Sequence, residues 1–254
     1  MRFLWRNLAD DGALSTNSEI STLPVANVQT PQLAERFYAA AGVTGVYIQV
    51  DLGSSLAVDL VAVLATTLTS ASTWRIRASD IDYTTGDLYD SGTVATGISA
   101  SSYPTAQAVL PSTVTARYWR VFVSDTSVDQ IQIGRLVMGP AYQPSRGPRL
   151  GYSIGWVDAA GRGVSRGGQI YVDPRYLRRR VTVQVRGVTE IEAIDSLLEL
   201  GRVAGTRSDV YAVLQESGSH VLEYSLWGLL DDGLVVTEEE YAVYSARLAI
   251  TERL

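Results

Sequence analysis

Polar and apolar residues alternate in a short run near the start of this 254-residue chain. In residues 47–53, Tyr47, Gln49 and Asp51 are separated by aliphatic residues. A period of two places one face of a β-strand on a core and the other face towards solvent. We therefore predict a half-buried strand here, and we expect Gly53 to end it.

Three further runs in the first half have the character of strands. Residues 58–64 are almost entirely aliphatic, and residues 116–121 contain Tyr and Trp between two arginines. In residues 73–79, Trp74 and Ile76 alternate with arginine. Several short strands separated by polar loops are typical of a β-sandwich.

The second half begins with a strand and a helix. Val181, Val183 and Val185 alternate with polar residues, which predicts a strand over 180–186. Thr189 and Glu192 have the spacing of a capping box, in which each side chain accepts a backbone N–H at a helix start. We expect an amphipathic helix that stops at Gly201 or Gly205, and its apolar positions are Ile191, Ile194, Leu197 and Leu198.

The rest of the second half returns to strands. Residues 209–214 and 221–230 have strand character, with a turn at Ser217 and Gly218. The acidic run 237–240 fits either a helix start or a strand. We choose a strand, because the residues that follow alternate at Tyr244, Ala246, Leu248 and Ile250.

A linker separates the two halves. Residues 139–148 contain three prolines and two glycines, which interrupt strand pairing. We predict a mainly β protein with a jelly-roll domain over 1–140, a linker and extended arm over 141–168, and a β-rich domain with one helix over 169–254. The glycine-rich stretch 151–168 is the predicted arm.

Composition narrows the possible functions. The chain has no cysteine and a single histidine, His220, and all 21 of its basic residues are arginine. These counts exclude a thiol nucleophile and a phosphate loop with its lysine, and we expect no enzyme activity and no cofactor. A net charge of −6 disfavours nucleic-acid binding, and no run is long enough to insert in a membrane.

Two carboxylate-based alternatives remain open in residues 80–90. Asp80 and Asp82 could serve the hydrolysis of a glycosidic bond, which uses two carboxyl groups. Together with Asp87 and Asp90 they could also bind calcium, which prefers oxygen ligands. A solvated acidic loop is the simpler interpretation, and we predict no metal site.

The first half resembles the discoidin, or coagulation-factor C-type, superfamily over roughly residues 14–140. The resemblance is carried by Ile48-Gln-Val-Asp-Leu-Gly53, Trp74-Arg-Ile-Arg-Ala-Ser-Asp80 and Ala116-Arg-Tyr-Trp-Arg-Val121. It implies a β-jelly roll that presents loops to glycans, lipids or proteins. Extracellular members commonly carry a disulfide, which this chain lacks, so packing alone must hold the domain together.

The second half resembles the belt domain of distal tail and tail-tube proteins of long-tailed phages and gene-transfer particles. The resemblance is carried by Ser165-Arg-Gly-Gly168 before Arg178-Arg-Arg-Val-Thr-Val183, and by the ending Leu248-Ala-Ile-Thr-Glu252. The resemblance implies a structural protein of a phage tail tip, in which the belt closes into a ring and the sandwich decorates it. The expected partners are copies of the chain, as a hexamer or a trimer, and the tail-tube and hub proteins. The expected location is the virion tail, assembled in the cytoplasm of the host bacterium.

Three groups of residues are candidates for function. A ring interface would use Trp156, Arg166, Arg178, Arg179 and Arg180, and a channel lining that repels DNA would use Asp231, Asp232, Glu238, Glu239 and Glu240. A glycan site on the host surface would use the loop tyrosines Tyr83, Tyr89 and Tyr103, whose rings can stack on sugars. The alternative function is thus a free-standing or accessory carbohydrate-binding, lectin-like module.

Overall fold

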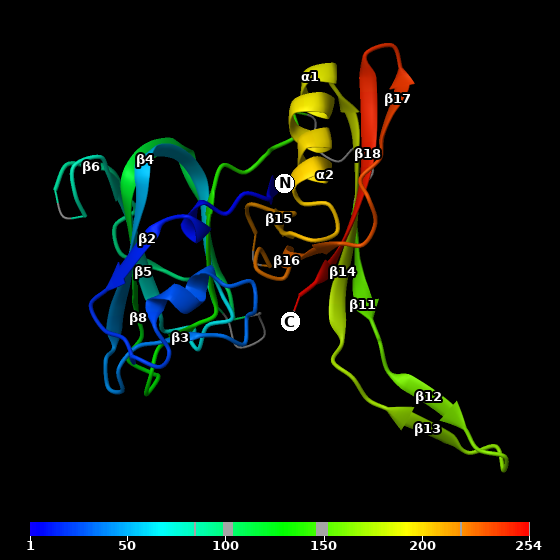
Figure 1. The fold of residues 1–254 in the computed structure, drawn as a ribbon, viewed down its shortest axis with the longest axis horizontal. Coiled ribbons are helices and arrows are strands. Elements are labelled where there is room, and N and C mark those ends of the chain that lie inside the picture. Colours follow the sequence, from blue (N-terminus) through cyan, green and yellow to red (C-terminus); the bar gives the residue numbers. More distant parts are fainter. Residues whose placement is uncertain (84, 99–103, 146–151, 219, 254) are drawn as a thin grey trace. The chain divides into compact units, whose positions relative to one another are not determined.

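The computed structural model describes residues 1–83, 85–98, 104–145, 152–218 and 220–253 (Figure 1). The protein is mainly β, and its described part contains one helix of α and π turns, over residues 190–203. The chain divides into two compact units. The first, called the sandwich unit, comprises residues 2–142 and 213–225; the second, called the sheet unit, comprises residues 143–212 and 226–254.

The sandwich unit is built on one curved antiparallel sheet in the order β10-β4-β8-β5-β6, with β2 added to β4 and β7 added to β5. A short pair, β3 with β9, lies outside this sheet. The strands are β1 (Arg2–Leu4), β2 (Ala13–Thr16), β3 (Phe37–Tyr38), β4 (Gly45–Leu64), β5 (Thr73–Ser79), β6 (Asp87–Asp90), β7 (Val94–Ala95), β8 (Ala106–Ser124), β9 (Gln132–Ile133) and β10 (Arg135–Gly139). Two 3-10 turns are η1 (Leu8–Asp10) and η2 (Val25–Gln29).

Two unusually long strands, β4 and β8, organise this unit. The prediction that Gly53 ends a strand was wrong, because β4 runs through it for 20 residues. Gly53 instead lies at a bulge between Asp51 and Leu56, where its φ of 74° is a conformation that favours glycine. Bulges bend a strand, and residues on both sides of this one, such as Ile48 and Val61, belong to the same core.

The predicted alternation places the core as expected. Trp74 and Ile76 on β5 are buried, and so are Ile48 on β4 and Trp119 on β8. The arginines that alternate with them are half-buried on the opposite face. With no cysteine in the chain, this packed core is the main stabilising element of the unit.

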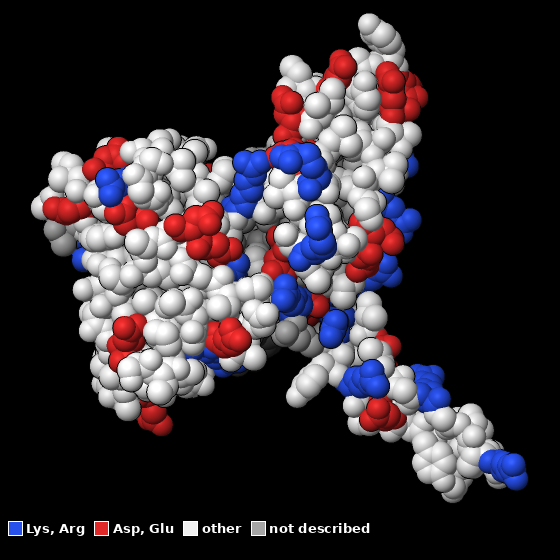
Figure 2. Space-filling view, in the orientation of Figure 1, with Lys and Arg blue, Asp and Glu red and all other residues white. Residues whose placement is uncertain are grey.

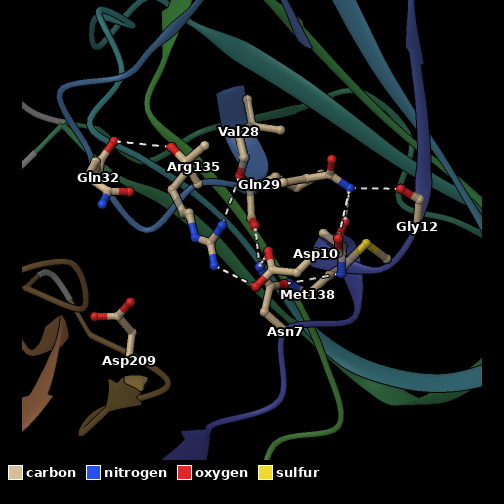
Figure 3. Close-up of polar contacts among 12 residues, drawn as sticks. Asn7, Asp10, Gly12, Val28, Gln29, Gln32, Arg135, Met138 and Asp209 are labelled. Carbon is tan, nitrogen blue, oxygen red and sulfur yellow. Dashed lines mark hydrogen bonds and ion pairs between the residues drawn. The ribbon is translucent and has the colours of Figure 1, made fainter. Parts of the chain in front are cut away.

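A polar cluster attaches the N-terminal segment to the sandwich (Figure 3). The Asn7 side chain donates to the Leu136 carbonyl at 2.9 Å and accepts from the Met138 amide at 2.9 Å, so it replaces a strand partner for β10. The buried Arg135 guanidinium donates to Asp10 Oδ2 at 2.6 Å. Burial raises the pKa of Asp10, although Arg135 acts to lower it.

The sheet unit is a mostly antiparallel sheet in which β15-β16-β18-β14-β11 follow one another and β17 pairs with β18. Its longest ladder joins β14 to β18. The strands are β11 (Tyr152–Val157), β12 (Gly161–Val164), β13 (Ile170–Asp173), β14 (Arg178–Val188), β15 (Asp209–Val213), β16 (Ser225–Leu230), β17 (Val236–Glu240) and β18 (Val243–Glu252). The choice of strand for the C-terminal segment is confirmed, whereas the predicted strand over 221–230 begins only at Ser225.

The helix follows β14 directly and consists of α1 (Glu190–Glu192), the π-helical turn η3 (Ala193–Leu198) and α2 (Glu199–Val203). The capping box is confirmed, since Thr189 and Glu192 each accept a backbone N–H of the other residue. The buried face differs from the predicted one. Leu197 and Leu200 are buried with Ala193, whereas Ile191, Ile194 and Leu198 are 72%, 50% and 46% exposed.

No helix among the described residues has the length and apolar character needed to cross a membrane.

The close contact between β16 and β18 predicts that alanine substitution destabilises the protein at one glycine of the sheet unit but not at another. A Cβ at Gly228 would overlap the backbone oxygen of Thr251 on β18, whereas a Cβ at Gly155 on β11 would meet nothing within 4 Å. We expect Gly228→Ala to lower the free energy of unfolding by about 1–3 kcal/mol, and Gly155→Ala to change it little. Urea unfolding followed by circular dichroism measures both, and equal losses would contradict this packing.

Candidate functional site

The hairpin β12–β13 carries an exposed apolar face. The pairing sets Val164 opposite Ile170 and Arg162 opposite Val172, and opposed residues of an antiparallel pair share a face. Val164, Ile170 and Val172 are 71%, 69% and 56% exposed. The other face carries Gly161, Gly163, Tyr171 and Asp173. We call residues 158–177, which contain this hairpin, the arm; the predicted arm over 151–168 included β11 and ended at the turn between β12 and β13.

The arm extends beyond the sheet that supports it (Figure 1). Tyr176 and Leu177, which connect it to β14, are 84% and 50% exposed. A two-stranded hairpin is marginally stable by itself in water, because it has no second layer to cover its apolar side chains. The arm is therefore a segment whose apolar surface is left uncovered within the single chain.

The base of the arm joins an edge strand. β11 ends the sheet and pairs with β14 on one side. Ile154 and Trp156 on this strand are 41% and 59% exposed. An edge strand offers main-chain groups to another chain, and large apolar side chains beside it favour such pairing.

The five predicted interface residues separate into three environments. Trp156 lies opposite Arg179 in the β11–β14 register, and Arg178 and Arg180 flank that position. Arg166 lies at the far turn of the arm. Arg178 is exposed, and Arg180 is paired with Asp231 at 2.6 Å between Nε and Oδ2.

Arg179 has a structural role inside the sheet unit. Its side chain is buried, and its Nε and Nη2 donate to Glu252 Oε1 at 2.9 and 2.6 Å. The Arg179 backbone N–H donates to the other carboxylate oxygen at 3.0 Å. This charge-assisted set fixes the first residues of β14 against the last residues of β18.

The predicted channel residues lie in two places, and each place is next to an arginine of β14. Asp231 and Asp232 follow β16, and the Asp231 carboxylate forms an ion pair with the Arg180 guanidinium. Glu238, Glu239 and Glu240 lie on exposed β17, where Glu239 is 3.6 Å from Arg186.

The acidic strand β17 lies close to the start of the helix. Desolvation raises the pKa of Tyr244 on β18, and the next contributions come from Glu238 on β17 and Glu190 on α1. The helical turn η3 contacts both β17 and β18, so the acidic residues at the helix start and on β17 lie on neighbouring elements.

An aromatic cluster lies at one end of the sandwich unit. The half-buried Tyr83 ring meets Tyr118 of β8 edge-on at 5.2 Å between centroids. The Arg117 guanidinium lies over Tyr118 at 4.8 Å and donates to both oxygens of Asp51, at 2.7 and 2.8 Å. The Asp51 pKa is lowered mainly by this hydrogen bond to Arg117.

The other two predicted tyrosines do not join this cluster. Tyr89 on β6 packs against the apolar core, and its pKa is raised first by desolvation. Tyr103 lies outside the described residues. Of the three predicted tyrosines, Tyr83 thus lies in the aromatic cluster. Tyr118 and Arg117 also belong to it, although the sequence predicted only a strand for them.

The four aspartates of residues 80–90 each have protein partners. Asp80 accepts from Ser55 and from the Arg117 amide, and Asp82 accepts from Thr85. Asp87 pairs with Arg77 at 2.6 Å, and Asp90 pairs with Arg75. In the described ranges, no group of three or more His, Cys, Asp or Glu residues is arranged to hold a metal ion.

Comparisons with known proteins returned structures but no sequence family. No family model matches the chain, and no curated protein matches it. Chitosan-binding module 1 from the chitosanase/glucanase of Paenibacillus sp. IK-5 covers 53% of this chain and 99% of its own, at 20% identity and a TM-score of 0.43. The lectin domain of lectinolysin, complexed with Lewis B antigen, covers 52% and 95%, at 12% identity and 0.42.

A longer protein is among the similar structures. The GH29 fucosidase E1_10125 of Ruminococcus gnavus, in complex with fucose, covers 54% of this chain and 27% of its own, at 15% identity and a TM-score of 0.44. These three similar structures are thus a carbohydrate-binding module, a lectin domain and a glycosidase, and none of the three is a tail protein.

The Arg75–Asp90 pair predicts a specific dependence of stability on acid. Hydrogen bonds from Arg75 lower the pKa of Asp90 from 3.8 to about 2. A carboxyl group with a depressed folded-state pKa stabilises the fold above its unfolded pKa, and this contribution disappears as the pH falls through the folded value. We expect Asp90→Asn to reduce stability at pH 6 and to converge with the parent near pH 2.

Urea unfolding at a series of pH values measures this effect. Asp129→Asn, at an exposed carboxylate of the same unit, is the control and should leave the acid profile unchanged. A constant difference between Asp90→Asn and the parent down to pH 2 would contradict the pairing.

Proposed function

We propose that this protein is a non-enzymatic structural component that assembles with copies of itself through its sheet unit, as a ring of the tail-tip type. The observation that supports this function best is the arm, whose aliphatic residues Val164, Ile170 and Val172 are more than half exposed. Exposed apolar surface of this kind, on a hairpin without a second layer, is typical of a segment that is covered in an assembly.

The edge strand supports the same function. β11 presents Trp156 and Ile154 beside the base of the arm, so apolar surface continues from the sheet edge into the hairpin. Pairing of this edge with a different surface of the next copy would be a head-to-tail contact. A contact of this type closes into a ring when the rotation between copies divides the circle, and otherwise continues as a filament.

A tail-tip ring gives the other features a role. Asp231 and Asp232, in the turn after β16, would suit a channel through which DNA slides without binding, and the sandwich unit would decorate the ring. The neighbouring tail-tube and hub proteins would complete the ring above and below. A hexamer or a trimer is the expected symmetry, and host-surface contact would come from the sandwich unit.

Self-assembly through the arm makes a testable prediction. We expect the full chain to form an oligomer of defined mass in native mass spectrometry, with ring-shaped particles in negative-stain images. Val164→Asp with Val172→Asp should shift the mass towards the monomer, because it places carboxylates within the apolar face. Gly163→Asp is the matched control, since it adds a charge on the opposite face of the same hairpin where a Cβ meets nothing.

Two results would contradict this function. One is a parent protein that stays monomeric at high concentration, and the other is an oligomer that the double variant leaves intact. Circular dichroism of the variants shows whether the fold is retained.

Carbohydrate binding by the sandwich unit is the second candidate function, either as a free-standing activity or as the means of host attachment. The observation that favours it is the Tyr83–Tyr118 cluster, which combines aromatic surface with Arg117 and the carboxylates of Asp51 and Asp80. Sugars are commonly bound by an aromatic ring that stacks on the pyranose face and by charged groups that bond the hydroxyls.

A glycan array of the full chain tests this candidate. We expect Tyr83→Ala to weaken binding of any positive glycan by about tenfold, because it removes the ring that would stack on the sugar. Tyr176→Ala, on the exposed arm, should leave glycan binding unchanged. An array with no positive glycan, or binding that survives Tyr83→Ala, would exclude this site.

A further inference from the structure

The helix of the sheet unit carries a second exposed apolar surface. Ile191, Ile194 and Leu198 are 72%, 50% and 46% exposed and follow one another at intervals of three and four residues, so they lie on one face. The opposite face of the helix is buried through Leu197 and Leu200. A surface helix normally turns such a stripe towards its own core, so this helix is apolar on two sides.

Acidic residues surround this exposed stripe. Glu190 and Asp195 are exposed on the helix, and Glu238 and Glu240 are exposed on β17. The helix contacts β17 through its turn η3 (Ala193–Leu198), so the two elements lie side by side. We call the stripe and these four carboxylates the acidic end.

The arm has the complementary composition. Its apolar face consists of Val164, Ile170 and Val172, with Arg162 on the same face opposite Val172. Arg166 and Arg175 are also exposed on the arm, and Arg175 is paired with Asp173, which lies on the other face of the hairpin. Figure 2 shows acidic side chains gathered over the part of the sheet unit that carries α1 and β17, and basic side chains together with an acidic one along the arm.

The connection between the two surfaces prevents them from meeting within one chain. β14 links them directly, because the arm ends at Leu177 and the helix cap is Thr189. An 11-residue strand spans about 33 Å, and β14 is held between β11 and β18 over its length. Figure 1 shows the arm leading away from the end of the sheet that carries the helix.

We propose that the acidic end is the docking site for the arm of the next copy of this chain. The inference rests on the proposed self-assembly and specifies its geometry. Three aliphatic side chains of the arm cover the helical stripe, and Arg162 meets the carboxylates that flank the stripe. Each copy then offers one arm and receives one, so the contact is head-to-tail and buries both exposed apolar surfaces.

Two single variants test the two sides of this contact. Ile194→Asp in the acidic end and Val172→Asp in the arm should each weaken self-association of the full chain by more than about tenfold, because each places a carboxylate in the apolar contact. Ile81→Asp is the matched control, since Ile81 is 68% exposed in the sandwich unit and should leave the mass unchanged. Sedimentation velocity and native mass spectrometry give the oligomeric state, and circular dichroism shows that each variant is folded. Leu198→Asp replaces Ile194→Asp if the latter does not fold.

Mixing the two variants provides the decisive measurement. A head-to-tail contact leaves one intact arm in the Ile194→Asp chain and one intact acidic end in the Val172→Asp chain. An equal mixture should therefore form heterodimers but no larger ring, and uniform labelling of one variant with ¹⁵N gives the heterodimer its own mass. A contact between two arms would not be restored by mixing.

The possible failures are distinguishable. A parent protein that remains monomeric would overturn both the proposed function and this inference. An oligomer that is lost with Val172→Asp but kept with both Ile194→Asp and Leu198→Asp would leave self-assembly through the arm intact and overturn the acidic end as its docking site. Loss of association in both single variants without heterodimers in the mixture would overturn the head-to-tail arrangement.

Discussion

The buried ion pair between Arg179 and Glu252 fixes the register of the strand on which the sheet unit depends. Glu252 accepts from the Arg179 backbone as well as from its guanidinium, so both the side chain and the main chain of β14 are held to β18. A one-residue slip of this ladder would turn Val181, Val183 and Val185 from the core towards solvent. Removing one partner would leave a buried charge without compensation, so the pair constrains the strand more strongly than a surface pair does.

This fixed strand carries a different element at each of its ends. The arm precedes β14 and the capped helix follows it, and both leave aliphatic residues exposed. Exposed apolar surface costs solubility in a monomer, and it is tolerated when the assembled state covers it. Because the rigid strand β14 keeps the exposed apolar surfaces of the arm and of the helix apart, contacts between copies are favoured over contacts within one copy. The same rigidity makes the angle between successive copies reproducible, which a closed ring requires.

Local sequence patterns predicted the elements well, and they predicted less well which faces are covered. The alternation at Trp74 and Ile76 and the capping box at Thr189 depend on neighbouring residues only, and both are confirmed. The prediction of the buried helix face was wrong, because periodicity shows that Ile191 and Ile194 share a face but does not show whether the fold covers that face. Gly53 was misread because a glycine with a positive φ occurs both in turns that end a strand and in bulges within one.

The site residues show the same limit. Tyr118 joins Tyr83 only because β8 pairs with β5, which sets Tyr118 opposite Ser79, and β4 brings Asp51 to the same place. No local signal distinguishes this Tyr118 from any other strand tyrosine, and the same holds for Arg179, which occurs in a run of three arginines but is the one buried beside Glu252.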